Sequence, residues 1–152
     1  MNIKITGVGS YTPNIRVVNK DFDKHVFLND DGTPFSHLNE VVIEKFKLIT
    51  GIEERRYAEN HLCSSDLAFI AAQRAIENAN IDPETLDYII FAHNFGDVKK
   101  GAIQGDMLPS LASKTKRNLG IKNSKCVAYD VLFGCPGWVE GMIQATAFIK
   151  AG

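Results

Sequence analysis

The chain has 152 residues, of which 45% are hydrophobic and 23% charged, a composition able to bury a core. Seventeen basic and eighteen acidic residues leave a formal charge of -1, which argues against nucleic acid or an anionic membrane surface as a partner. The N-terminal residues lack the apolar core of a signal peptide, and no apolar run approaches the roughly 18 residues needed to cross a bilayer. We therefore expect a cytoplasmic protein whose three cysteines, Cys63, Cys126 and Cys135, are free thiols.

The N-terminal third of the chain carries one strand pattern and one helix pattern. Alternating apolar residues predict a strand over residues 2–9, followed by a loop that ends at Pro13. This loop lacks the third glycine of a dinucleotide-binding fingerprint, so that type of site is not expected. Asn39 is expected to cap a helix through Ile49, which Gly51 ends.

Helix and strand patterns alternate along the rest of the chain. The predicted elements are a helix whose apolar face runs from Leu67 to Ala79, a strand over 86–92, a helix from Pro109 to between Asn118 and Gly120, and a strand over 125–133. Ser64 or Ser65 is expected to cap the first of these helices. The order predicts an α/β fold with a parallel or mixed sheet, in which ligand chemistry lies at the carboxyl ends of the strands. His93, Asn94 and Cys135 lie at such ends.

Cys135 follows a predicted strand directly and precedes a predicted helix. Pro136 suits the first turn of that helix, and Gly134 and Gly137 remove Cβ atoms on both sides of the thiol. The free N–H groups at a helix N-terminus favour the thiolate, which is the nucleophilic form. The spacing alone leaves a second interpretation open, in which Cys135 is a small buried hydrophobic residue.

Several ordered motifs resemble the β-ketoacyl-acyl-carrier-protein synthase III family of thiolase-fold condensing enzymes. The motifs are the opening strand and loop over residues 5–13, Thr50-Gly51-Ile52 with Arg55 and Arg56, Leu108-Pro109-Ser110, Leu119-Gly120-Ile121, and Asp130-Val131 before Gly134-Cys135-Pro136-Gly137. The resemblance implies that residues 1–152 form an incomplete N-terminal thiolase-like domain. Such a domain is a mixed sheet with helices on both faces, which is half of a layered αβαβα fold.

The resemblance also implies a reaction. Cys135 accepts an acyl group from an acyl thioester, and malonyl-acyl carrier protein loses carbon dioxide to give a carbanion that attacks the acyl group. In the family a His and an Asn assist the decarboxylation, and neither residue matches a position in this sequence. The chain alone is therefore expected to be inactive. The implied partners are acyl carrier protein and a second copy in a homodimer, and no cofactor or metal is implied.

Departures from the family pattern bear on the substrate. Lys45 and Ile49 stand where the family has the tryptophan and arginine that hold the adenine of coenzyme A, which puts ordinary coenzyme A binding in doubt. Leu108 stands at the acyl-pocket position that many members fill with phenylalanine, so a different or longer acyl group is expected there. Asn94 falls near the catalytic glutamate of hydroxymethylglutaryl-CoA synthases, which disfavours that reaction. Leu108 and Asn94 are the candidate substrate-binding residues.

Two other functions stay open. One is a related condensing enzyme of aryl-polyene, alkylresorcinol or polyketide synthesis, and the other is a non-catalytic subunit that completes a dimer. For several residues a structural role is expected. His93 is expected to be a hydrogen-bonded structural histidine. Core packing is expected of Trp138 and Met142, and Cys63 and Cys126 are expected to be packing residues. Solvent exposure, rather than contact with a carrier protein, is expected of the basic residues Lys114, Lys116, Arg117, Lys122 and Lys125.

Overall fold

The computed structural model describes residues 3–152, which form two compact units. One unit comprises residues 12–59 and contains strands β1 (Ile15–Val18) and β2 (Glu54–Tyr57), which pair antiparallel, and helix α1 (Asn39–Thr50). Gly51 ends α1 in the left-handed conformation, with φ 68°, as its position in the sequence predicts. Asn39 does not cap α1, because its side-chain amide donates to the carbonyls of Asp23 and His25 instead.

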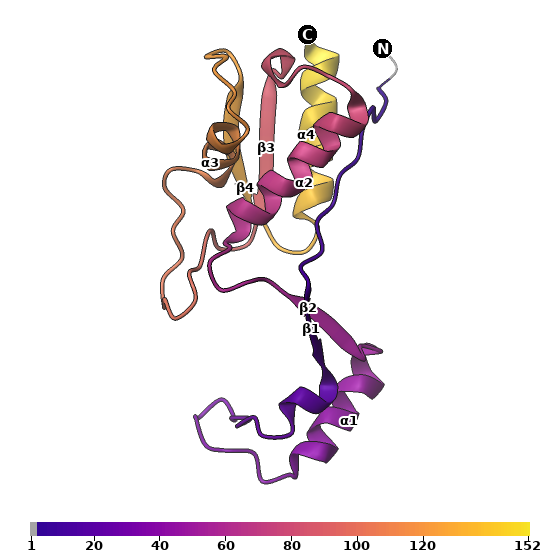
Figure 1. Cartoon of the computed structure of the whole chain (residues 1–152), viewed down its shortest axis with the longest axis vertical. Helices are drawn as coiled ribbons and strands as arrows, with labels where there is room; N and C mark the ends of the chain where they lie inside the picture. The colour runs from indigo at the N-terminus through magenta and orange to yellow at the C-terminus, as the bar shows by residue number, and fades with distance from the viewer. Residues whose placement is uncertain (1–2) are drawn as a thin grey trace. The chain divides into compact units, whose positions relative to one another are not determined.

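The other unit comprises residues 3–11 and 60–152 (Figure 1). Its elements are α2 (Ser64–Ala79), β3 (Tyr88–His93), α3 (Leu111–Asn118), β4 (Val127–Leu132) and α4 (Gly137–Ala151). β3 and β4 pair parallel, with Ile90 opposite Tyr129. This confirms the predicted α/β arrangement of strand, helix, strand and helix.

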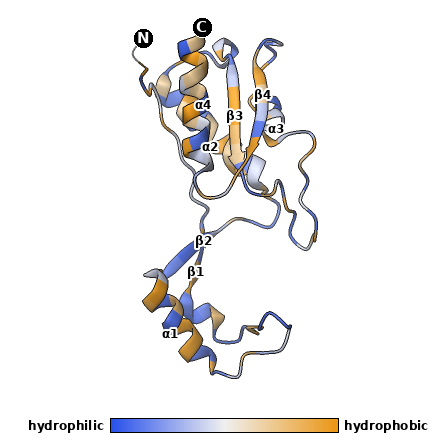
Figure 2. Cartoon of the chain, turned by 180° about the vertical axis from the view of Figure 1, so that it is seen from behind, coloured by the Kyte–Doolittle hydropathy of each residue, from blue (hydrophilic) through white to orange (hydrophobic). Residues whose placement is uncertain are grey.

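Helices cover both faces of the β3–β4 pair. α4 packs on the face that carries Ile90 and Ala92, where Gly141 and Gly137 allow close approach. α3 packs on the opposite face, and α2 packs against α3. The buried apolar core lies mainly on the α3 side and includes Leu111, Ala112, Ile121 and Cys126. β3 is mostly apolar along its length (Figure 2), as expected of a strand covered on both faces.

The sequence predicts a strand over residues 2–9, of which the structure describes residues 3–9. The prediction is wrong for residues 3–9, and Asn2 lies outside the described residues. These residues have no ladder partner and run along α2 instead. A Cβ on Gly7 or Gly9 would lie within 2.6 Å of a backbone oxygen of α2, so the two glycines let this segment lie directly on the helix. The backbone N–H of Val8 donates to the side chain of Asn78, 3.0 Å away. The glycines face α2, whereas the apolar side chains of Ile5 and Val8 are exposed.

The starts of two helices also differ from prediction. Neither Ser64 nor Ser65 caps α2; the Asp66 carboxylate instead accepts the backbone N–H of Cys63, 2.8 Å away. α3 begins at Leu111 rather than Pro109, because Ser110 caps it by accepting the N–H of Ser113. Both helices are held at their N-termini by side-chain oxygens that satisfy free N–H groups.

The outer face of α4 is open within the described residues. Trp138, which we expected to pack in the core, is 68% exposed, whereas Met142 is half-buried. Val139 and Ile143 are exposed as well. The expectation is wrong for Trp138, because no element of the unit formed by residues 3–11 and 60–152 covers this side of the helix.

Candidate active site

Cys135 lies on a tight turn between β4 and α4. The backbone N–H of Phe133 donates to the carbonyl of His93 at 3.0 Å, so pairing with the β3 end continues past the last residue of β4. The chain then reverses, and the N–H of Gly137 donates to the carbonyl of Gly134 at 2.9 Å. Cys135 and Pro136 occupy the two central positions of this turn, and Cys135 is exposed. The strand–thiol–helix arrangement inferred from the sequence is present.

The two glycines beside Cys135 have different roles. A Cβ on Gly137 would lie 3.2 Å from the Cβ atoms of both Ala92 and Phe133, so glycine allows the start of α4 to approach the end of β3. A Cβ on Gly134 would meet only the Cδ of Pro136, at 4.0 Å. Glycine at 134 therefore leaves open space beside the thiol rather than relieving a clash. Pro136 is the N-cap of α4 and not part of its first turn, so Cys135 lies just before the helix.

The other two cysteines lie in different surroundings. Cys126 is buried in the core below α3, and Cys63 is half-buried at the start of α2. Burial raises the pKa of the Cys63 thiol, and the nearby carboxylates of Asp97 and Asp66 raise it further. A raised pKa reduces the thiolate fraction. Exposure and position therefore favour Cys135 as the reactive thiol.

His93 ends β3 and is hydrogen-bonded through both ring nitrogens, as we expected. Its side chain is 7% exposed, its Nε2 lies 3.0 Å from Oδ2 of Asp130, and its Nδ1 accepts the backbone N–H of Gly96 at 2.8 Å. Asp130 also accepts the N–H groups of Leu111 and Ala112 at the start of α3. A single acidic residue inside the apolar strand 125–133 is the sequence signal that could have revealed this network, because a buried carboxylate needs partners.

The candidate substrate-binding residues lie on one long connection between β3 and α3. Asn94 is exposed directly after β3, at the same edge of the parallel pair as the Cys135 turn. Leu108 lies near the far end of the connection, three residues before Leu111, and is 83% exposed. The structure places Asn94 and Cys135 after neighbouring strands, whereas Leu108 is an exposed residue at the other end of the connection.

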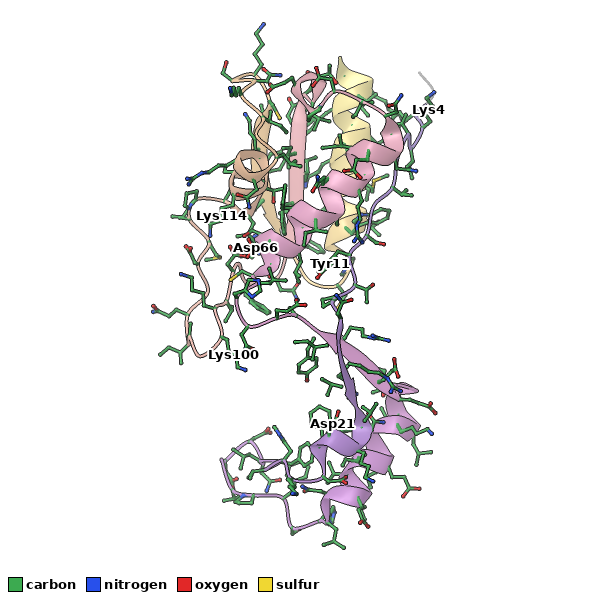
Figure 3. The ribbon with its side chains drawn as sticks, in the orientation of Figure 1. Lys4, Tyr11, Asp21, Asp66, Lys100 and Lys114 are labelled. Atoms are coloured by element: carbon green, nitrogen blue, oxygen red, sulfur yellow. The ribbon has the colours of Figure 1, made fainter. Side chains whose placement is uncertain are left out.

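The same connection is closed at its base by a buried ion pair. Asp97 and Asp106 exchange two backbone hydrogen bonds, and Asp97 is 6% exposed. The Asp97 carboxylate accepts the N–H of Ser65 at 2.8 Å and its hydroxyl at 2.7 Å. The Lys114 ammonium donates to Asp97 at 3.1 Å and to Asp106 at 2.9 Å. Figure 3 labels Lys114 on α3 and Lys100 on the outer part of this connection.

This ion pair corrects one expectation and was not found from the sequence. Lys114 is not a solvated helix-end lysine, since its side chain is 20% exposed and contacts two carboxylates. Burial alone would raise the pKa of Asp97, but the hydrogen bonds from Ser65 and Lys114 outweigh it and lower that pKa. Burial would likewise lower the pKa of Lys114, and its two carboxylate partners raise it. Both groups are therefore held in their charged forms.

Neither a metal site nor a membrane-spanning helix is found among residues 3–152. No group of three or more His, Cys, Asp or Glu side chains in this range lies close enough to hold a metal ion. No helix in the range is both long and apolar enough to cross a membrane.

Known proteins of one family are similar to this chain in sequence. No protein-family model matches the chain. It is 36% identical to the β-ketoacyl-[acyl-carrier-protein] synthase III of Caldanaerobacter subterraneus over 97% of the chain and 38% of that protein. It is also 36% identical to the synthase III of Oceanobacillus iheyensis over 100% of the chain and 41% of that protein. The chain thus spans about two fifths of the length of these relatives.

Solved structures agree with the sequence comparison. The 3-oxoacyl-[acyl-carrier-protein] synthase III of Aquifex aeolicus matches 98% of the chain and 41% of its own length, with a TM-score of 0.71 and 30% identity. OleA of Xanthomonas campestris matches all of the chain and 40% of its own length, with a TM-score of 0.75 and 22% identity, which is evidence of the fold alone. A priming β-ketosynthase of a polyketide biosynthetic pathway matches 93% of the chain and 36% of its own length, with a TM-score of 0.70 and 25% identity.

The fold is that of the thiolase-like condensing enzymes. Within that class, the chain belongs to the β-ketoacyl-[acyl-carrier-protein] synthase III family.

Proposed function

We propose that the protein is an acyltransferase that joins an acyl thioester to malonyl-acyl carrier protein by decarboxylative Claisen condensation, as in fatty acid synthesis. The observation that carries the proposal is the exposed Cys135 thiol on the turn between β4 and α4, in a chain of this family. The other two thiols are buried or half-buried.

The reaction has two stages. The Cys135 thiolate attacks the carbonyl carbon of the acyl thioester, and the donor's thiolate leaves and takes up a proton. Malonyl-acyl carrier protein then loses carbon dioxide, and the resulting carbanion attacks the acyl-Cys135 carbonyl and releases the cysteine thiolate. Backbone N–H groups at the start of α4 are suited to stabilise the oxyanion of each tetrahedral intermediate. Leu108 and Asn94 would contact the substrate, and the scheme uses no metal or organic cofactor.

We further propose that residues 1–152 supply the acyl-accepting part of the site as an N-terminal domain. The decarboxylating His and Asn would come from a further polypeptide segment, and the working form would be a homodimer that receives acyl carrier protein. The 38–41% share of the relatives' length that the chain spans supports this division.

A second candidate is condensation in secondary lipid or polyketide synthesis. Leu108 at the acyl-pocket position favours it, because leucine there leaves room for another acyl group. The likeness to a priming β-ketosynthase of a polyketide pathway is consistent with this candidate. The chemistry at Cys135 would be the same, and the acyl group would differ.

Product analysis tests the proposal. The protein is expressed from its native genomic context, so that any completing polypeptide is present, and is given malonyl-acyl carrier protein with acyl thioesters of several lengths. We expect a β-ketoacyl product by mass spectrometry, with formation slowed at least about a thousandfold in Cys135→Ser, as is typical when a nucleophile is removed. Cys63→Ser is the matched control and should keep the wild-type rate. Product formed by Cys135→Ser at the wild-type rate would instead favour the non-catalytic subunit.

A further inference from the structure

One carboxylate connects the two ends of the segment over residues 94–110. Asp130, in the middle of β4, accepts the N–H of Leu111 at 2.7 Å and the N–H of Ala112 at 2.8 Å. It also lies 3.0 Å from Nε2 of His93. Leu111 and Ala112 are fully buried, so an N–H that lost its acceptor there would find no water. Asp130 therefore fixes the first turn of α3, at the C-terminal end of the segment.

His93 extends this contact to the N-terminal end of the segment. Because its Nδ1 accepts the N–H of Gly96 at 2.8 Å, that nitrogen carries no proton, and the ring proton lies on Nε2 and is donated to Asp130. Both ring nitrogens are committed and the side chain is 7% exposed. The imidazole is therefore arranged to transmit the position of Asp130 to Gly96.

The same strand leads to the reactive cysteine. Asp130 precedes Cys135 by five residues, and the carbonyl of His93 accepts the N–H of Phe133 at 3.0 Å. Four protein segments thus meet at the Asp130–His93 pair: the end of β3, β4 with its turn, the chain at Gly96 and the first turn of α3.

We propose that Asp130 is a positioning residue, which acts through His93 and the start of α3 to hold both ends of the 94–110 segment, with Asn94 and Leu108, against the strand that presents Cys135. The inference rests on the proposed function in that Leu108 contacts the acyl group. Asp130 itself does not touch the substrate. Its loss alters which acyl groups reach Cys135, and the thiol itself stays reactive.

The test uses Asp130→Asn in protein expressed from its native genomic context. Asparagine keeps the size of the side chain but offers one acceptor oxygen, and its NH₂ group would face N–H donors. Asp106→Asn is the matched control, since Asp106 lies on the same segment but is an exposed partner of Lys114. Three kinds of rate are measured for each protein: acylation of Cys135 by acetyl and by dodecanoyl thioesters, alkylation of Cys135 by iodoacetamide, and amide hydrogen exchange at Gly96, Leu111 and Ala112.

We expect Asp130→Asn to change the ratio of the two acylation rates by about tenfold or more, since a displacement of about 1 Å can cost about a hundredfold in rate. The alkylation rate should stay within about twofold of wild type, because it depends on the thiol alone. Exchange should speed up at both Gly96 and Leu111–Ala112. An unchanged acyl ratio, a parallel loss of alkylation and acylation, or faster exchange at one end only would overturn the proposal.

A variant of His93 tests the same connection from its other end. If Asp130→Asn does not fold, His93→Phe serves instead: it keeps a ring but neither hydrogen bond, and it should expose the Gly96 amide while Leu111 and Ala112 stay protected. If none of these amides exchanged faster than in wild type, the connection would be refuted. If wild-type Cys135 is not acylated at all, the proposed function fails, whereas the exchange rates still decide whether Asp130 holds both ends.

Discussion

Replacing Asp97 with asparagine should destabilise the fold far more than its single charge suggests. The Asp97 side chain is 8% exposed, and its carboxylate accepts two hydrogen bonds from Ser65, at 2.8 and 2.7 Å. A hydrogen bond to a charged group contributes about 1.5–3 kcal/mol, and asparagine keeps only one acceptor oxygen. Lys114 loses its contact with Asp97 at 3.1 Å but keeps Asp106. The loss of this contact should therefore lower the free energy of unfolding by only about 0.2–1 kcal/mol, as for a surface ion pair. We expect the free energy of unfolding to fall by about 2–3 kcal/mol.

Urea unfolding followed by circular dichroism measures this change. The variants are compared at one protein concentration, and the comparison requires that the free energy of unfolding depends on urea concentration with the same slope in each. Asp106→Asn is the control, since it removes the exposed partner of the same lysine and should lower the free energy of unfolding much less than Asp97→Asn does. The reasoning is refuted if Asp97→Asn unfolds within about 0.5 kcal/mol of wild type, the range of ordinary surface substitutions. Equal losses in the two variants would also contradict it, because burial would then not matter.

Three more predictions follow from the site and its surroundings. Carrier-protein thioesters should be better acyl donors than coenzyme A thioesters by about tenfold or more in kcat/KM. The reason is that Lys45 and Ile49 replace the adenine-holding side chains of the family, and an aromatic stack on adenine contributes about 1–3 kcal/mol. Equal kcat/KM for both donors would contradict this prediction. The pKa of Asp97 is lowered, so its contribution to stability is present above its unfolded pKa of about 3.9 and is lost as pH falls through the folded value. The pKa of Lys114 is raised, so its contribution is present below its unfolded pKa of about 10.4 and is lost as pH rises through the folded value. Urea midpoints that fall less steeply toward acid pH in Asp97→Asn than in wild type would agree with this, and identical profiles would not. The difference at alkaline pH should be smaller, because Asp106 still pairs with Lys114. The isolated chain should self-associate through the exposed side of α4 around Trp138, which light scattering and dye binding can measure, and a monomer that binds no dye would contradict it.

Local patterns predicted the elements that are defined by their own residues. The apolar run over residues 86–92, the strand before Cys135 and the stop at Gly51 all depend on neighbours in sequence, and β3, β4 and the end of α1 are present as expected. The turn at Cys135 was predicted for the same reason, because glycines and a proline restrict that stretch of backbone.

Contacts between distant residues could not be predicted in this way. The start of the chain has the alternation of a strand, yet Gly7 and Gly9 place it on α2, 62 or more residues away in sequence. Lys114 has the sequence context of a solvated lysine, and only the fold brings it to Asp97. Trp138 has the pattern of a core residue, but what covers a helix depends on elements beyond its own. Pairing and burial are tertiary properties that override local preference.

The most direct test of the account is to find which cysteine accepts an acyl group. Protein expressed from its native genomic context is incubated with a radiolabelled acyl thioester, denatured with acid and digested, and the labelled peptide is sequenced. The account predicts label on Cys135, unchanged by a metal chelator, with Cys63 and Cys126 unmodified. Label on Cys63 or Cys126 while Cys135 stays free would contradict it.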